Sequence, residues 1–181
     1  MKTKQLALGA VLTALALGLS YMERFLPLEL LVPLPGVKLG LANVVTLAAL
    51  YTAGGRTAAA VLVLRCLLGA AFGGGVTALA FSLTGGLLAL GAMTAARHLP
   101  GLSVYGVSVL GAAAHNAGQI LAAMAVLRSV YVAAYLPFLL VVAAATGLLT
   151  GAAAAGTLRA LSAARSIPLY RKQNHLGGIQ P

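Results

Sequence analysis

The chain has 181 residues, of which 61% are hydrophobic and 8% are charged, whereas about a quarter of the residues of a soluble domain are charged, so we predict an integral-membrane protein. The net charge of +10 does not indicate nucleic-acid binding, because most of the cations lie in short connections or in the tail, where they orient membrane proteins. No Asp is present, and Glu23 and Glu29 are the only Glu residues, which excludes reactions that hold magnesium on paired carboxylates within this chain.

The first apolar run, Leu6 to Tyr21, follows two lysines and is predicted to be a retained transmembrane helix rather than a cleaved signal peptide. The run is long for a signal core, no small-residue cleavage site follows it, and further spans come after it. Within it, Ala10, Ala14 and Gly18 repeat at a four-residue interval, which lets another helix approach closely. That helix belongs either to this chain or to a different subunit.

The segment 23–37 contains three prolines among apolar residues, which favours a loop folded back onto the membrane face. The second span is predicted over Leu39 to Ala53, with Asn43 about 7 Å below its outer end at about 1.5 Å per residue. Residues 54–56, with the sequence Gly-Gly-Arg, then make a tight cytoplasmic turn.

The third span, Thr57 to Phe72, carries Arg65 near its centre, where an arginine needs a partner or an anion. Cys66 is expected to be a small buried side chain, since a single cysteine forms neither a disulfide nor a cysteine metal site within one chain. Three glycines at residues 73–75 end this helix on the outer side. The fourth span, Val76 to Ala96, carries Ser82 and Thr84, whose hydroxyls either contact a ligand or bond back to their own helix.

The fifth span, Val104 to Leu127, has His115, Asn116 and Gln119 near its middle. Lipid offers these side chains no hydrogen-bond partners, so they face the protein interior, a partner or a water-filled cavity. Two interpretations stay open, a ligand site or polar contacts that join helices. The sixth span, Val130 to Ala160, has a stripe of small residues that we expect to serve helix packing: Ala143, Gly147, Gly151 and Ala155.

The distribution of Lys and Arg predicts six spans with both termini in the cytoplasm, in a multi-pass protein of the cell membrane. The outer side then holds Arg24, Lys38 and Arg128. The inner side holds eight basic residues: Lys2, Lys4, Arg56, Arg97, Arg159, Arg165, Arg171 and Lys172. We predict one six-span membrane domain over residues 1–165 and a basic cytoplasmic tail over residues 166–181.

Polar groups from several helices fall at one level in the outer half of this all-α bundle, below the loop 23–37. They outline a pocket that is open to the outside. With two cations and no intramembrane carboxylate, this pocket suits a neutral-polar or anionic ligand with an apolar body. The predicted ligand-binding residues are Lys38, Asn43, Arg65, Thr84, His115, Asn116 and Gln119.

Four strings resemble the Gx transporter family, which is also labelled heptaprenyl diphosphate synthase component I. They are P-G-V-K-L-G-L-A-N-V-V-T-L (Pro35 to Leu47), L-R-C-L-L-G (Leu64 to Gly69), S-L-T-G-G (Ser82 to Gly86) and A-H-N-A-G-Q-I (Ala114 to Ile120). That family is similar to the substrate-binding S components of energy-coupling factor transporters. The resemblance implies six helices, an outer substrate site roofed by the first loop, and a first-helix stripe that docks on a transmembrane coupling subunit.

The resemblance carries these roles onto particular residues of this chain. Docking would fall to Ala10, Ala14 and Gly18, although that stripe usually has Ala where Gly18 stands. Substrate binding would fall to Asn43, Arg65, His115, Asn116 and Gln119. The chain has no G-x-x-x-x-G-K motif, so any ATP hydrolysis belongs to separate ATPase subunits.

We therefore predict a non-catalytic binding subunit of a transporter, with no metal and no cofactor. Its substrate would be a vitamin-like compound, an isoprenoid or quinone precursor, or a flavin-related compound. One alternative is a non-catalytic membrane subunit of a prenyl diphosphate synthase, which would need a separate catalytic subunit. Another is a membrane component of a flavin-dependent electron-transfer system, where His115 as a heme ligand would lack an evident second ligand.

Overall fold

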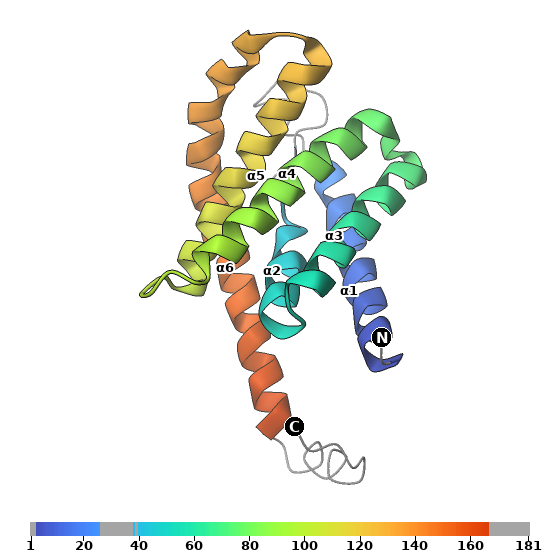
Figure 1. Ribbon diagram of the computed structural model, residues 1–181, viewed down its shortest axis with the longest axis vertical. Coiled ribbons are helices and arrows are strands. Elements are labelled where there is room, and N and C mark those ends of the chain that lie inside the picture. Colours follow the sequence, from blue (N-terminus) through green and yellow to red (C-terminus); the bar gives the residue numbers. More distant parts are fainter. Residues whose placement is uncertain (1–2, 26–37, 39, 167–181) are drawn as a thin grey trace.

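A computed structural model describes residues 3–25, 38 and 40–166, and every regular element in these residues is helical (Figure 1). The α-helices are α1 (Thr3–Met22), α2 (Asn43–Thr52), α3 (Gly55–Gly69), α4 (Gly75–Ala96), α5 (Val104–Leu127) and α6 (Leu136–Ser166). Three shorter helices are η1 (Glu23–Phe25), η3 (Ala70–Gly74) and η4 (Val130–Tyr135). Most of the predicted proline-rich loop and the tail after residue 166 lie outside the described residues.

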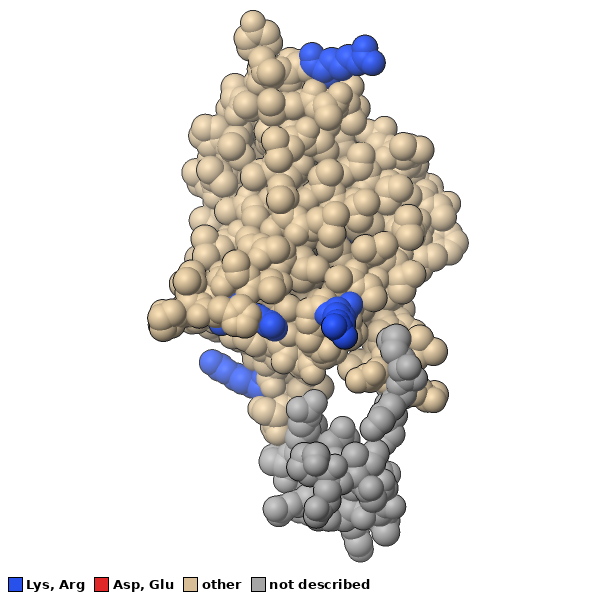
Figure 2. Space-filling view, in the orientation of Figure 1, with Lys and Arg blue, Asp and Glu red and all other residues tan. Residues whose placement is uncertain are grey.

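The chain is a multi-pass membrane protein. Within the described residues, 4 helical segments are long and apolar enough to cross a membrane: Gln5–Met22, Gly55–Ala96, Val104–Leu127 and Val130–Ala163. The face in Figure 2 has a wide band of uncharged residues between Lys and Arg side chains at its two ends. Such a band is what a bilayer with a hydrocarbon core of about 30 Å requires. The six-span count and the cytoplasmic placement of the termini stay predictions.

The segment Gly55–Ala96 contains two helices, because the chain turns back inside it. Phe72 (φ −86°, ψ 44°) and Gly73 (φ 91°) leave the helical region, and α3 and α4 run from this turn as a hairpin. The predicted break at the three glycines is therefore confirmed. In Figure 1 the start of α1 and the end of α6 lie at the bottom, opposite the turn between α5 and α6.

The helix α2 is shorter than the predicted span, because Gly40 adopts the left-handed region (φ 82°) and the helix begins only at Asn43. With 10 residues it is about 15 Å long, which is half of the hydrocarbon core. Leu47 and Leu50 are each 1% exposed, so α2 lies inside the bundle rather than against lipid. Near its C-terminal end, Arg97 Nη1 donates to the Leu50 carbonyl oxygen at 3.1 Å.

The helix α5 has the predicted bounds, since Ser103 caps its first turn and Arg128 ends it in the left-handed region (φ 50°). It packs closely on α4 and α6 through glycines. A Cβ at Gly118 would lie 2.7 Å from the Gly85 Cα on α4, and a Cβ at Gly147 would lie 2.6 Å from the Val109 Cα. The α6 stripe that contains Gly147 is buried, which confirms the prediction that it serves packing.

Candidate functional site

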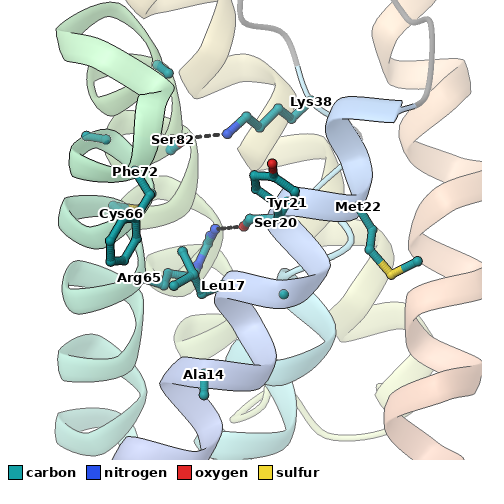
Figure 3. A pocket seen from close by; sticks show the side chains of 14 residues that line it. Ala14, Leu17, Ser20, Tyr21, Met22, Lys38, Arg65, Cys66, Phe72 and Ser82 are labelled. Atoms are coloured by element: carbon teal, nitrogen blue, oxygen red, sulfur yellow. Dashed lines mark hydrogen bonds between the residues drawn. The ribbon is translucent and has the colours of Figure 1, made fainter.

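A cavity of about 600 Å³ lies between α1, α3 and α4, near the end of the bundle where η1 and η3 lie. Most of its lining is apolar, and Lys38, from the segment before α2, closes one side (Figure 3). The lining residues are Ala14, Leu17, Gly18, Ser20, Tyr21, Met22, Lys38, Arg65, Cys66, Gly69, Ala70, Phe72, Ala78 and Ser82.

Arg65 is the most unusual residue of this lining, because its charged side chain is 4% exposed in the middle of α3. Its Nη1 donates to Ser20 Oγ on α1 at 3.0 Å. Its Nε and Nη2 are buried and have no hydrogen-bond partner among the described residues. A buried ion is strongly destabilising unless it is paired, so these two donors are expected to meet an anion or a polar acceptor.

Lys38 brings a second positive charge to the cavity from the opposite side (Figure 3). Its Nζ donates to Ser82 Oγ on α4 at 3.3 Å. Its backbone is held by the Gln119 carboxamide on α5, in the orientation that satisfies both ends of the amide. The Gln119 nitrogen then donates to the Lys38 carbonyl oxygen at 3.0 Å, and the Gln119 oxygen accepts from the Lys38 N–H at 2.9 Å.

His115 and Asn43 support this arrangement from behind. In the same orientation of the amide, His115 Nε2 donates to the Gln119 oxygen at 3.2 Å, so the ring carries its proton on Nε2. A Cβ at Gly40 would lie 2.9 Å from Asn43 Nδ2 and 3.1 Å from His115 Cδ2. The backbone at Gly40 therefore lies this close to α5 because Gly40 has no side chain.

The remaining two predicted site residues contact their own surroundings. Asn116 Nδ2 donates to the Leu139 carbonyl oxygen on α6 at 2.7 Å, which supports the alternative that this side chain joins helices. Thr84 is exposed, and its Oγ1 donates to the Ala80 carbonyl oxygen at 2.7 Å, as hydroxyls in spanning helices often do. The structure thus brings Lys38 and Arg65 to the cavity, groups Asn43, His115 and Gln119 behind Lys38, and leaves Asn116 and Thr84 apart.

Sequence reasoning missed Ser20 and Glu23. Glu23 is 4% exposed, and its Oε1 accepts from the Leu41 N–H at 2.7 Å, which ties the end of α1 to the start of α2. Burial raises the pKa of the Glu23 carboxyl above its ordinary value, although the Leu41 N–H, Arg65 and Lys38 offset part of this effect. The sequence feature that could have identified Glu23 is the scarcity of acidic residues. The chain has only two Glu residues, and one of them directly follows the first apolar run, which indicates a specific role.

The stripe predicted for docking lies on the outer surface of α1. Ala10, Ala14 and Gly18 are all exposed, and a Cβ at Gly18 would meet nothing within 4 Å. Ala14 and Gly18 also line the cavity, so Ala10 is the member of the stripe that faces outward without taking part in the lining.

A model of the heptaprenyl diphosphate synthase component I family matches residues 12–157, which include most of α1 and α6 and everything between them. The chain belongs to that family. The match confirms the resemblance derived from the four sequence strings, and it covers every residue that lines the cavity. Comparisons with curated proteins and with solved structures gave no match. The described residues of this family member contain no group of three or more His, Cys or acidic side chains that could hold a metal ion.

Proposed function

We propose that the chain is the substrate-binding membrane subunit of a transporter, similar to an S component. In this proposal a small vitamin-like, isoprenoid or quinone-precursor, or flavin-related compound binds in the cavity between α1, α3 and α4. The observation that carries the proposal is Arg65, a buried cation that lines a cavity of about 600 Å³ and whose Nε and Nη2 have no hydrogen-bond partner in the part of the chain that the structure describes. A concave, mostly apolar site with a few converging polar groups is typical of small-molecule binding.

The predicted site residues take two roles in this proposal. Arg65 and Lys38 contact the ligand directly, because they line the cavity. Gln119 positions Lys38 through its backbone, His115 donates to Gln119, and Asn43 lies next to Gly40. The chain contributes no catalytic group, and coupling and ATPase subunits supply the energy for transport in the cell membrane.

The direct test of binding is mass spectrometry of ligand retained by the purified protein, beside the variant Ala78→Phe. Ala78 lines the cavity on α4, and a phenyl ring there narrows the cavity. We expect a small molecule to accompany the wild-type chain and to be lost from the variant. An unchanged set of bound molecules in both proteins would contradict the proposal.

The partner subunits are tested by co-purification with Ala10→Leu, because Ala10 is exposed and does not line the cavity. A leucine there should weaken association with a coupling subunit, since the small-residue stripe no longer admits a helix at close range. The matched control is Ala152→Leu, an equal change at an exposed position of α6. Equal recovery of coupling and ATPase subunits with all three proteins would contradict docking on α1.

A second candidate function is a non-catalytic membrane subunit of a prenyl diphosphate synthase. The observation that favours it is the description of the matched family, which names a component of such an enzyme. Co-purification separates the two candidates. Recovery of a soluble prenyl synthase, with synthesis activity lost when this chain is removed, would favour the synthase subunit.

A further inference from the structure

We infer that the ligand is an amphiphile with a phosphate-type headgroup, which Arg65 and Lys38 bind, and an apolar chain that lies between α1 and the α3–α4 hairpin. This inference rests on the proposed function and specifies its substrate class. It also gives the route of the ligand, which enters sideways from the hydrocarbon region of the bilayer.

The headgroup assignment follows from the hydrogen bonds of Arg65. Ser20 accepts from Nη1 and so holds one end of the guanidinium group. The two unpartnered donors, Nε and Nη2, are on one edge of that plane, and their N–H bonds are parallel. Such an edge matches two oxygens of one oxyanion, in the bidentate geometry that arginine uses for phosphate and carboxylate groups.

The number of charges favours phosphate over carboxylate. Lys38 reaches the same cavity from the other side, and its Nζ lies 3.3 Å from Ser82 Oγ. Two cations and a hydroxyl group suit a headgroup with three terminal oxygens and close to two negative charges better than a carboxylate with two oxygens and one charge. The only carboxyl side chain of the described residues, Glu23, bonds to the Leu41 N–H. Its charge attracts Arg65 but leaves Nε and Nη2 without a hydrogen bond, so these two donors are available to the ligand.

The apolar chain is assigned from the rest of the lining. Leu17 and Met22 of α1 line the cavity together with Phe72 and Ala78 of the hairpin. Met22 and Phe72 are each 65% exposed, Met22 at the end of a helix long and apolar enough to cross the membrane and Phe72 in the turn between α3 and α4. The open side of the cavity therefore faces lipid, where an alkyl or isoprenoid chain remains without contact with water.

The test measures binding of dodecyl phosphate, dodecanol and inorganic phosphate to the full chain in phosphatidylcholine nanodiscs, by native mass spectrometry and thermal shift. Arg65→Lys keeps the charge and loses the bidentate edge. Arg56→Lys is the matched control, because Arg56 is an exposed residue of the same helix. Ala78→Phe narrows the cavity and leaves both cations in place.

We expect one dodecyl phosphate per chain and a higher melting temperature, with much weaker effects of dodecanol and of inorganic phosphate. Arg65→Lys should weaken dodecyl phosphate binding about tenfold or more. Ala78→Phe should abolish it, and Arg56→Lys should leave it unchanged.

Each other outcome overturns a defined part of the inference. Equal binding of inorganic phosphate and dodecyl phosphate would show a free-anion site without a chain. Equal binding of dodecanol and dodecyl phosphate, both lost in Ala78→Phe, would contradict the assignment of a phosphate-type headgroup. The proposed function would remain supported. Binding that persists unchanged in Arg65→Lys would place the headgroup elsewhere. No binding of any probe, together with no retained molecule in the wild-type chain, would overturn the inference and the proposed function together.

Discussion

Glu23 joins the end of α1 to the start of α2 through one short hydrogen bond, from the Leu41 N–H to its Oε1. Burial raises the pKa of this carboxyl, and Arg65 and Lys38 are the charged groups that offset the shift. The folded state therefore favours the protonated form. A raised carboxyl pKa gives a stability contribution that is complete below the unfolded pKa and is lost as the pH rises through the folded pKa.

The first prediction compares Glu23→Gln with the wild-type chain in melting experiments from about pH 4 to about pH 7. Gln imitates the protonated carboxyl and still accepts the Leu41 N–H, so the two proteins should melt alike at the acidic end. As the pH rises through the raised pKa of Glu23, only the wild-type chain must bury a charge. The melting temperature of the variant should then exceed that of the wild-type chain, and a difference independent of pH would contradict the assignment.

Gln119 allows a second test at this scale, because both ends of its amide bond to the Lys38 backbone. Gln119→Met keeps the volume and removes these bonds, and it leaves buried polar groups without partners. We expect a loss of about 1 to 3 kcal/mol in stability and weaker ligand binding, since Lys38 is no longer held in position. Both quantities are measured, by unfolding in mixed detergent micelles and by calorimetric titration of the folded protein.

The matched variant for this test is Asn116→Ala. Asn116 sits on the same helix, is 3% exposed and donates to the Leu139 carbonyl oxygen on α6. We expect it to lower stability by a similar amount and to leave ligand affinity unchanged. Loss of ligand affinity in Asn116→Ala would instead support the prediction that Asn116 binds the ligand.

The helices α4 and α5 cross at Gly85 and Gly118, which belong to two of the sequence strings that identify the family. A Cβ at Gly118 would lie 2.7 Å from the Gly85 Cα and 2.8 Å from the Thr84 carbonyl oxygen. Both neighbours are backbone atoms, so relief requires that the helices move apart. This close approach also carries His115 and Gln119 toward Lys38.

The third prediction concerns Gly118→Ala, which should destabilise the protein by about 1 to 3 kcal/mol because it overpacks the crossing. Gly156→Ala on α6 is the control, since its Cβ would meet nothing within 4 Å. There the better helix propensity of Ala should leave stability unchanged or raise it by up to about 1 kcal/mol. The melting temperatures of both variants are compared, and equal values would contradict a tight crossing of α4 and α5.

The elements were predictable to the extent that their ends carry local signals. The bounds of α5 followed from its apolar run between Ser103 and Arg128, and the three glycines after Phe72 marked the hairpin turn. The start of α2 was not predictable from hydropathy, because it depends on a left-handed Gly40 lodged between Asn43 and His115.

At the scale of the whole molecule, the depth of a residue along its helix was a weaker guide to the candidate site than the face of the helix on which the residue lies. Thr84 and Ser82 lie at nearly the same level of α4, yet Ser82 lines the cavity and Thr84 is exposed. Sequence periodicity gives neither the rotation of α4 about its axis nor its neighbours. The buried Arg65 was recognisable from sequence, since a mid-span arginine requires a partner, whereas its bond to Ser20 required the packing of α1 on α3.

The fourth prediction tests sidedness with single cysteines in a Cys66→Ala background. His98→Cys lies in the turn between α4 and α5, and Tyr131→Cys lies in η4, where Tyr131 is 86% exposed. With both termini cytoplasmic, an impermeant thiol reagent should label position 131 in intact cells and position 98 only after permeabilisation. The reverse pattern would invert the orientation.

The shortness of α2 has a consequence for the biogenesis of the protein. A helix of 10 residues gives the translocon only half of a span to recognise, so α2 does not partition into the bilayer by itself. Its native surroundings include α6, which follows all the other described helices in the chain. The helix α2 therefore reaches its place only after the ribosome has made the C-terminal half, and membrane integration of this chain ends with a folding step rather than with a sequence of independent insertions.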